Sequence, residues 1–295
     1  MINTFKNAKN KNSILYPQKF ITNEKNETWF FIQEVNVLLN RLFLQLSRRP
    51  SGLISGIIQP LLWLILFGAL FQNAPVGLFI LNTKYNQFIS TGIIIFTAFT
   101  GALNAGLPLI FDREFGFLNR LLVSPIKAKD TILISFAYFI ITTTILQTAI
   151  ILIFSLTFFE YHFSVMKTII CIIIVLLITL IISSISIGLA LSLPGHIEFL
   201  AILVLINNPM LFSSTALAPL SFMPYWLQII ACLNPLTYAI ESLRFISVVK
   251  NCKFTSVIVQ TVWLKINLLE ILIILTILTI ANFSLAKKVI INKVK

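Results

Sequence analysis

Long apolar runs separated by short polar segments dominate the pattern of this chain. Six of the runs are close to the roughly 20 residues that a helix needs to cross a bilayer. None has the alternating apolar and polar residues of a membrane β-barrel strand. The pattern therefore predicts an all-α, polytopic membrane protein with six transmembrane helices. The predicted spans are residues 53–71, 88–110, 132–158, 168–193, 199–217 and 266–286.

The segments around these spans fall into separate classes. Residues 1–27 are polar and rich in Asn and Lys, and are predicted to be a disordered tail. Residues 28–49 have the polar and apolar faces of an amphipathic helix that lies in the membrane interface. They precede a transmembrane domain at residues 50–287, and residues 288–295 form a basic tail.

The stretch of residues 224–249, before the last span, is too polar for a clean span and too apolar for a solvated loop. Pro235 interrupts it directly after Asn234, so we expect a pair of re-entrant or surface helices broken at this point. Irregular backbone at membrane depth is tolerated only where protein buries it. Glu241 and Arg244 are three residues apart and are expected to pair on the second helix, which gives them a structural role in shaping a gate.

A charged segment, residues Asp112–Pro125, lies between the second and third predicted spans. Its three consecutive ionisable side chains would cost about 8–10 kcal/mol at the bilayer centre, taking roughly 3 kcal/mol each, so we expect it at a membrane surface. The apolar spacing predicts one short helix, with Asp112 and Glu114 in its first turn, Arg120 towards its end, and a stop at Ser124–Pro125. Either it is a solvated loop whose charges only set topology, or it docks a soluble partner.

Composition strengthens the membrane assignment. The chain is 58% hydrophobic and 11% charged, with a mean hydropathy of +0.95, whereas soluble domains carry about 25% charged residues. The net charge of +12 resides mainly in the tails and one internal loop, which fits membrane orientation and anionic lipid better than nucleic acid. Sixteen Lys and Arg fall on one side of the predicted topology and six on the other, so both termini and the charged segment are expected on the side of synthesis.

Enzyme chemistry has little support in the sequence. The two Asp, Asp112 and Asp130, form no paired-carboxylate motif for Mg²⁺, and the two His, His162 and His196, are far apart and without metal-ligand spacing. The sequence contains no phosphate-binding P-loop, so we expect no catalytic, cofactor or metal site and no ATP site on this chain. The predicted spans carry no ionisable residue at their centres, which argues against ion-driven transport.

Polar residues inside the spans leave alternatives open. Asn207, Asn208 and Pro209 interrupt the fifth predicted span, either as a kink whose carbonyls are satisfied by neighbours or as a flexible gate or path lining. The Gly52–Gly56 stretch matches the Gly-x-x-x-Gly helix-contact pattern, which is weak evidence for one interface. Cys171 is expected in the core, while Cys232 and Cys252 are either free thiols or a disulfide.

Two motifs resemble the membrane subunit of ABC-2 type transporters. The family's first motif has the form Arg-Glu-x-Gly-x-x-x-x-Leu-Leu-x-Ser-Pro, and its second Asn-Pro-Leu-Thr-Tyr-x-x-Glu-x-x-Arg, preceded by a Pro and then Met-Pro-x-Trp-Leu. Many members carry Thr and Glu where this chain has Phe117 and Asn119; the version here is similar to cyanobacterial and plastid-encoded permeases. The matching residues are Arg113, Glu114, Gly116, Leu121, Leu122, Ser124 and Pro125, then Pro219, Met223, Pro224, Trp226 and Leu227, then Asn234, Pro235, Leu236, Thr237, Tyr238, Glu241 and Arg244.

The resemblance implies a dimer of such subunits together with two separate ATPase subunits that hold ATP and Mg²⁺. It implies that the charged segment couples ATP-driven closure of those subunits to the membrane path, with Arg113, Glu114 and Arg120 needed at the docking face. The implied activity is export of a lipid-like, drug-like or glycan substrate, in a plastid membrane or a bacterial inner membrane. The rival interpretations are a membrane assembly or scaffold factor without transport activity, and an ion-coupled carrier.

Overall fold

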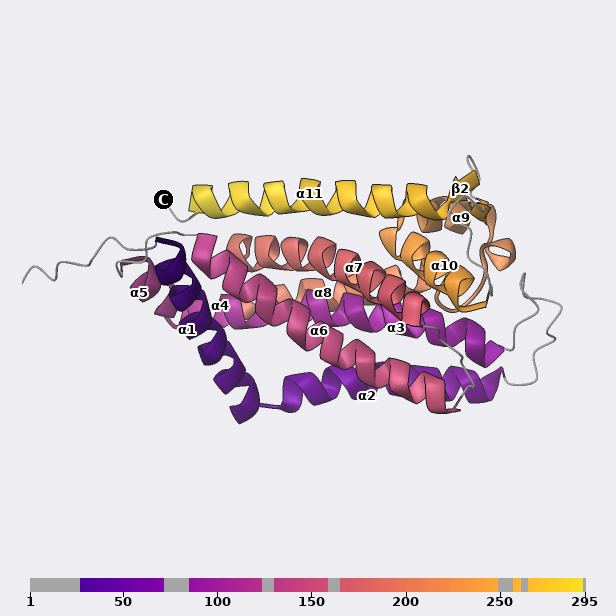
Figure 1. Ribbon diagram of the computed structural model, residues 1–295, viewed down its shortest axis with the longest axis horizontal. Helices are drawn as coiled ribbons and strands as arrows, with labels where there is room; N and C mark the ends of the chain where they lie inside the picture. The colour runs from indigo at the N-terminus through magenta and orange to yellow at the C-terminus, as the bar shows by residue number, and fades with distance from the viewer. Residues whose placement is uncertain are drawn as a thin grey trace, which may run out of the picture.

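The computed structural model describes residues 27–71, 85–123, 130–158, 165–248, 257–260 and 265–293. Its long helices run side by side in one bundle, and α1 lies obliquely across one end (Figure 1). In chain order the elements are α1 (Glu27–Arg48), α2 (Ser51–Leu70), α3 (Tyr85–Asn104), α4 (Leu107–Glu114), α5 (Phe117–Val123), α6 (Asp130–Phe158), α7 (Val165–Ser192), α8 (His196–Phe212), the 3-10 turn η2 (Leu220–Phe222), α9 (Tyr225–Leu233), α10 (Pro235–Val248), β1 (Val257–Gln260), β2 (Lys265–Asn267) and α11 (Leu268–Lys293).

Five helical segments in the described residues are long and apolar enough to cross a membrane, which confirms the all-α polytopic class. They are α2, α3 together with α4, α6, α7 and α11, and the α9–α10 pair adds a sixth if it is counted as one span bent by 87°. Helix α8 has 17 residues, or about 25 Å, which is less than the ~30 Å hydrocarbon core. The fifth predicted span, 199–217, is longer than this helix because the chain leaves the helix after Phe212.

Helix α3 forms the centre of the bundle. It packs against α2, α6, α7 and α10, and 16 of its 20 residues are buried. Its buried Ser and Thr hydroxyls donate to carbonyls of the same helix, so α3 can occupy the centre without unsatisfied hydroxyl groups. By contrast, α2 buries only Pro60, Leu64 and Gly68, so most of its apolar surface is left for lipid or another protein.

The amphipathic N-terminal segment forms α1, whose apolar face packs on α6. Val35 and Leu42 are buried in this contact, and the rings of Phe43 and Phe139 lie 5.3 Å apart. Contact with protein thus replaces part of the lipid contact that an interfacial helix would make. Elsewhere on its surface α1 carries exposed apolar side chains, including Trp29 and Ile32.

The charged segment and the stretch of residues 224–248 lie at opposite ends of the bundle (Figure 1). Helices α1, α4 and α5 and the last turns of α11 gather at one end, called the α4–α5 end below. Helices α9 and α10 and the start of α11 lie at the other, the α9–α10 end. Strands β1 and β2 pair antiparallel directly before α11, so the last predicted span begins in a strand and becomes helical only at Leu268.

The Asn207–Asn208–Pro209 triplet does not interrupt its helix, which corrects the prediction. Helix α8 passes through Pro209 and ends at Phe212, one turn later. Proline removes one backbone donor and disturbs the turn before it, yet Pro209 still accepts a bond from the Ser213 N–H at 2.8 Å. The bond that is lost is the one to the Leu205 carbonyl, so the cost of proline falls on the turn before Pro209, while the helix continues to Phe212.

Candidate functional site

The charged segment is not one helix, and this corrects the prediction. It forms the end of α4 and the whole of α5, which meet at Phe115 and Gly116. Gly116 has φ = +70°, a left-handed conformation that glycine adopts without steric cost and that ends a helix. Because α4 begins at Leu107, Asp112 and Glu114 lie in its last turn rather than a first turn. The side chain of Leu122, and Ser124 and Pro125 altogether, lie outside the described residues.

Asp112 joins α4 to the N-terminal helix. Its carboxylate is 6% exposed and accepts two hydrogen bonds from the Arg41 guanidinium of α1, with Nη1 to Oδ2 at 2.6 Å. Such a two-pronged ion pair is among the strongest side-chain contacts. The Arg41 guanidinium carbon also lies 3.5 Å from the centroid of the Phe117 ring in α5, a cation–π contact. Arg41 therefore connects α1 to both helices of the charged segment.

Arg113 holds the carboxyl end of α7. Its Nη1 donates to the carbonyl of Leu191 and its Nη2 to that of Pro194, both at 2.9 Å, and Nη2 also donates to the Leu193 carbonyl. The last carbonyls of a helix have no partner within it and carry partial negative charge, which favours a cation at this position. Arg113 is thus occupied within the subunit rather than free for a partner.

Glu114 holds the amino end of α8. Its carboxylate accepts from the backbone N–H of His196 and contacts His196 Nδ1, both at 2.6 Å. A carboxylate at a helix N-terminus satisfies an orphan donor and matches the positive end of the helix dipole. Phe111 places its ring 5.3 Å from the His196 ring, so the contact has an apolar neighbour. No pattern in the sequence pairs His196 with this segment.

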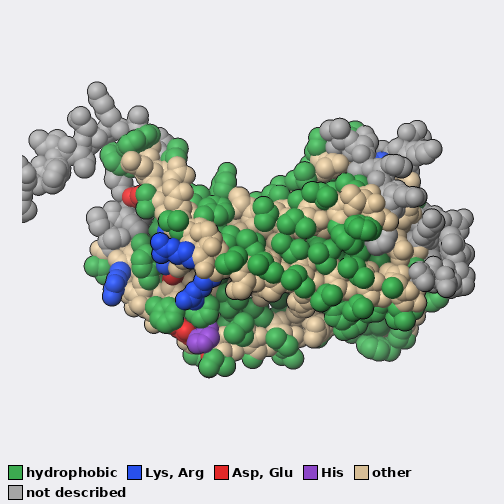
Figure 2. Space-filling view, turned by 90° about the horizontal axis from the view of Figure 1, so that it is seen from below, with side chains coloured by type: hydrophobic (Ala, Val, Ile, Leu, Met, Phe, Trp, Pro, Cys, Tyr) green, Lys and Arg blue, Asp and Glu red, His purple; other side chains and the backbone are tan. Residues whose placement is uncertain are grey.

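The charged segment therefore presents a different surface from the one predicted. Arg113 and Glu114, expected at a docking face, are bonded to the end of α7 and the start of α8, while Arg120 is exposed. Phe115 and Val123 are 78% and 88% exposed. Together with Arg120 and Asn119 these residues form the outward-facing surface of the segment. It is called the docking face below, after the role that is proposed for it. Figure 2 shows most of the visible charged and histidine side chains gathered at this end of an otherwise largely apolar surface.

The second motif forms a sharp corner between α9 and α10, which meet at 87°. At the corner Asn234 Oδ1 accepts from the Leu236 N–H at 3.0 Å, and its Nδ2 donates to the Met210 carbonyl at 3.1 Å. Pro235 is the first residue of α10, where a missing N–H has no cost. Tyr238 donates its hydroxyl to the Cys232 carbonyl at 2.6 Å, across the corner. The Thr237 hydroxyl is buried and has no hydrogen-bond partner within the described residues.

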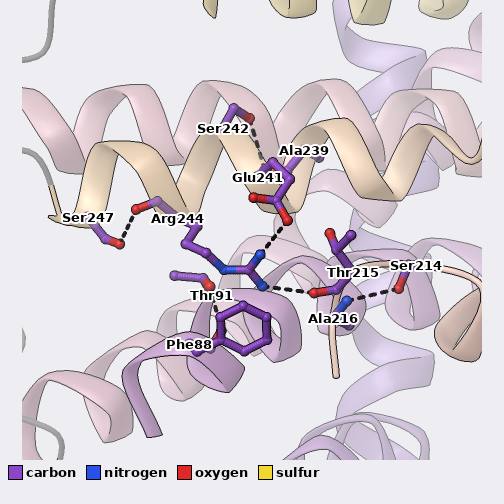
Figure 3. A network of polar contacts seen from close by, with 10 residues as sticks. All are labelled: Phe88, Thr91, Ser214, Thr215, Ala216, Ala239, Glu241, Ser242, Arg244 and Ser247. Carbon is purple, nitrogen blue, oxygen red and sulfur yellow. Dashed lines mark hydrogen bonds and ion pairs between the residues drawn. The ribbon is translucent and has the colours of Figure 1, made fainter. Parts of the chain in front are cut away.

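Arg244, the cation of the second motif, is buried, with 4% of its surface exposed. It pairs with Glu241, which confirms the predicted contact. Its Nη2 donates to the Thr215 carbonyl at 2.8 Å, and its guanidinium carbon lies 3.6 Å from the centroid of the Phe88 ring (Figure 3). Arg244 thus ties α10 to α3 and to the turn after α8, neither of which could be paired with it from the sequence.

Several glycines allow close approaches in the bundle, among them Gly92 and Gly56. A Cβ at Gly92 of α3 would lie 2.6 Å from the Ala216 carbonyl oxygen, so the turn after α8 packs directly on α3. A Cβ at Gly56 of α2 would lie 2.4 Å from the Gln147 amide nitrogen, whereas Gly52 faces open space. Only the second glycine of the Gly-x-x-x-Gly pattern therefore makes a tight contact, and its partner is the buried amide of α6.

The remaining candidate residues have simple positions. Asn208 and Pro209 are exposed on α8, while the Asn207 side-chain oxygen is buried without a partner among the described residues. Cys171 and Cys232 are buried free thiols, and Cys252 lies outside the described residues. Within the described part of the chain no three His, Cys, Asp or Glu side chains are grouped to hold a metal ion.

Comparison with known proteins adds a family to this geometry. A family model described as ABC-2 type transporter matches residues 33–248, which include both polar sites. The chain is similar to proteins named transport permease ycf38: 51% identical to that of Porphyra purpurea, over 84% of this chain and 86% of the relative, and 52% identical to that of Cyanophora paradoxa, over 89% and 91%. It is 23% identical to the doxorubicin resistance ABC transporter permease protein DrrC of Mycobacterium tuberculosis, over 75% and 79%.

Proposed function

The chain belongs to the ABC-2 type transporter family, and on this premise we propose that it exports an amphiphilic substrate with energy supplied by a separate ATPase subunit. It is a membrane permease component of an ABC transporter, a transport subunit rather than an enzyme. What is proposed beyond this is the ATP-Mg-binding partner, the place where that partner acts, the pairing of two permease subunits, and the substrate class.

The observation that carries the proposal is the division of labour within the charged segment. Arg120 and Val123 face outward, while Asp112, Arg113 and Glu114 are bonded to α1, α7 and α8. A protein that pushes on the outer face would therefore displace three other helices through short polar contacts. This arrangement suits an element that converts closure of an external ATPase into movement of the membrane helices.

The docking face also has the chemistry of a protein contact. It offers exposed apolar side chains, Phe115 and Val123, beside the charged Arg120. Aromatic side chains such as Phe115 and arginines such as Arg120 are enriched in protein interfaces. A solvated loop that only sets topology would have no need of them, and a scaffold factor would have no need of the bonds behind them.

The substrate class is proposed from the surface and from a relative. Both α2 and α11 expose many large apolar side chains, among them Leu66 and Ile280, which suits contact with lipid, with a second permease subunit and with amphiphilic molecules. The name of the DrrC relative connects that protein with doxorubicin resistance, and doxorubicin is drug-like. A lipid-like, drug-like or glycan substrate therefore remains the proposed class, with export as the direction.

The proposed location is a plastid membrane, with both termini on the side of synthesis. The relatives in Porphyra purpurea and Cyanophora paradoxa are algal proteins, which supports a plastid origin over a bacterial inner membrane. The end of α11 and the charged segment lie at the same end of the bundle (Figure 1), as this topology requires.

The test places one cysteine on the docking face and asks whether nucleotide changes its contact with an ATPase. Val123→Cys is made in a chain whose native cysteines are replaced by alanine, and each ABC ATPase subunit of the source organism is co-expressed in turn. We expect one ATPase to co-purify and to cross-link at position 123 in a manner that ATP changes. Leu233→Cys, 72% exposed on α9 at the other end, is the matched control and should not cross-link.

The rival functions give different results in the same preparation. A scaffold factor would show no nucleotide-dependent cross-link and no ATP-dependent movement of lipid or drug in proteoliposomes. An ion-coupled carrier would transport in response to an ion gradient without ATP. Either result would overturn the proposed function.

A further inference from the structure

Helix α8 is held at both ends by the two motifs that the sequence singled out. Glu114 of the first motif binds its first residue, His196. Asn234 of the second motif binds the Met210 carbonyl in its last turn, and Arg244 binds the Thr215 carbonyl just beyond it. Among the described helices, α8 alone is hydrogen-bonded both to Glu114 and to Asn234. Figure 1 shows α8 running between the two ends of the bundle.

The contact at the amino end of α8 is tight. The turn that enters α8 passes so close to α4 that a Cβ on Gly195 would lie 3.0 Å from the Glu114 carboxylate and 2.7 Å from that of Glu198. Arg113 holds the same turn through the carbonyls of Leu193 and Pro194. We therefore expect movement of α4 to carry the start of α8 with it, because the hydrogen bonds of Arg113 and Glu114 join the two.

At the carboxyl end of α8, the side chains of Asn234 and Arg244 donate hydrogen bonds to backbone carbonyls in and just beyond the helix. Asn234 Nδ2 lies 3.1 Å from the Met210 carbonyl and 3.3 Å from the Ser213 hydroxyl. The same amide caps α10 through its oxygen, 3.0 Å from the Leu236 N–H. A displacement of the end of α8 is thus delivered to the corner where α9 meets α10.

Between its ends α8 is loosely packed. Its buried residues are only Phe199, Leu203 and Leu211, while Val204 and Leu205 are 65% and 71% exposed. A helix is stiff along its axis because every turn is hydrogen-bonded. Side chains that pack closely along α8 would fix it in place, whereas polar contacts at its two ends let it shift as one rod about 25 Å long.

We propose that α8 is the strut that transmits movement of the charged segment to the α9–α10 corner, with Glu114, His196 and Asn234 as its positioning residues. The inference rests on the proposed function, since it needs an ATPase that moves the charged segment. It adds the route: displacement enters at the Glu114–His196 contact, travels along α8 and leaves through Asn234. Coupling of this kind is a free energy between two sites and requires an element that both sites grip.

The test breaks each link separately in the complete transporter with its ATPase subunit. Glu114→Ala breaks the entry link, and Asn234→Asp breaks the exit link while keeping the oxygen that caps α10. Two reporters are used with a maleimide probe: Asn208→Cys on α8 and Trp226→Cys on α9, both at exposed positions. The matched control for lost charge is Glu198→Gln. Glu198 lies in the same turn of α8 as His196, but its side chain makes no hydrogen bond within the described part of the chain.

The order of losses is the result expected. In the parent and in Glu198→Gln, ATP should change the labelling of both reporters. Glu114→Ala should abolish the change at both, while Asn234→Asp should abolish it at Trp226→Cys only. In both link variants ATP hydrolysis should persist and transport per ATP should fall on the order of tenfold, within the usual range of coupling free energies.

The outcomes separate this inference from the function on which it rests. If ATP changes the Val123→Cys cross-link but both reporters still respond in Glu114→Ala, the strut is overturned and the proposed function stands. If Glu114→Ala fails to assemble, Asn234→Asp decides: a response retained at Trp226→Cys overturns the strut, and one lost there supports it. If the parent shows no nucleotide-dependent cross-link at position 123, the proposed function and the strut are both overturned.

Discussion

The two polar sites hold helices together by the same means but differ in burial. At the α9–α10 end, Arg244 is 4% exposed and binds a carboxylate, a carbonyl and an aromatic face. At the α4–α5 end, the Glu114–His196 contact has side chains that are 22% and 40% exposed. Breaking a buried ion pair leaves a charge without water, whereas an exposed pair contributes little to stability. The first site therefore suits a fixed junction, and the second suits a contact that moves.

The sharpest test of this comparison removes the partner of the buried cation. Glu241→Ala leaves the Arg244 guanidinium buried with its main counter-charge gone, which should cost about 3–5 kcal/mol of unfolding free energy. The change in unfolding free energy is measured by unfolding the protein in detergent and monitoring its helical circular dichroism. The double variant Glu241→Ala, Arg244→Met has no buried charge and should regain much of it. Equal losses in the single and double variants would show that burial of this pair is not the source of the difference.

A smaller loss of unfolding free energy is expected from the Arg41–Asp112 pair, which is the more buried contact of the α4–α5 end. Asp112→Asn weakens the paired contact with Arg41, and hydrogen bonds to charged groups contribute about 1.5–3 kcal/mol. The same unfolding measurement should show a loss in this range, below that of Glu241→Ala. A double-mutant cycle with Arg41→Ala isolates the pair. A coupling energy near zero would mean that α1 is held by its apolar packing on α6 alone.

The smallest effect on stability is expected at the docking face, where the functional effect should be largest. Arg120→Ala and Val123→Ser alter exposed side chains and should change the unfolding free energy by no more than about 0.5 kcal/mol. Binding of the ATPase subunit should weaken about thirtyfold, since the loss of a hot-spot residue costs about 2 kcal/mol or more. Co-purification and ATPase titration measure this. Ile230→Ser, exposed on α9, is the control, and unchanged ATPase binding in both docking-face variants would contradict the proposed face.

Much of the fold follows from local patterns. Apolar runs of about 20 residues predict helices near α2, α6, α7 and α11 because hydrophobicity and helical periodicity are properties of neighbouring residues. The Glu241–Arg244 pair was predictable for the same reason, since residues three apart share a helix face. The break at Gly116 was not predicted, because the apolar spacing continued across it and only the backbone conformation marks the turn.

The sequence by itself determined the class of the protein, the positions of its apolar helices and the two motifs that carry the family resemblance. Only the tertiary structure decided what the charges of the first motif do. Asp112 binds a residue 71 positions earlier, and Glu114 one 82 positions later. Contacts over such separations depend on how helices pack, and no local period encodes them. The same packing decides that α8 joins the two motifs, because its ends meet Glu114 and Asn234 only in the folded bundle.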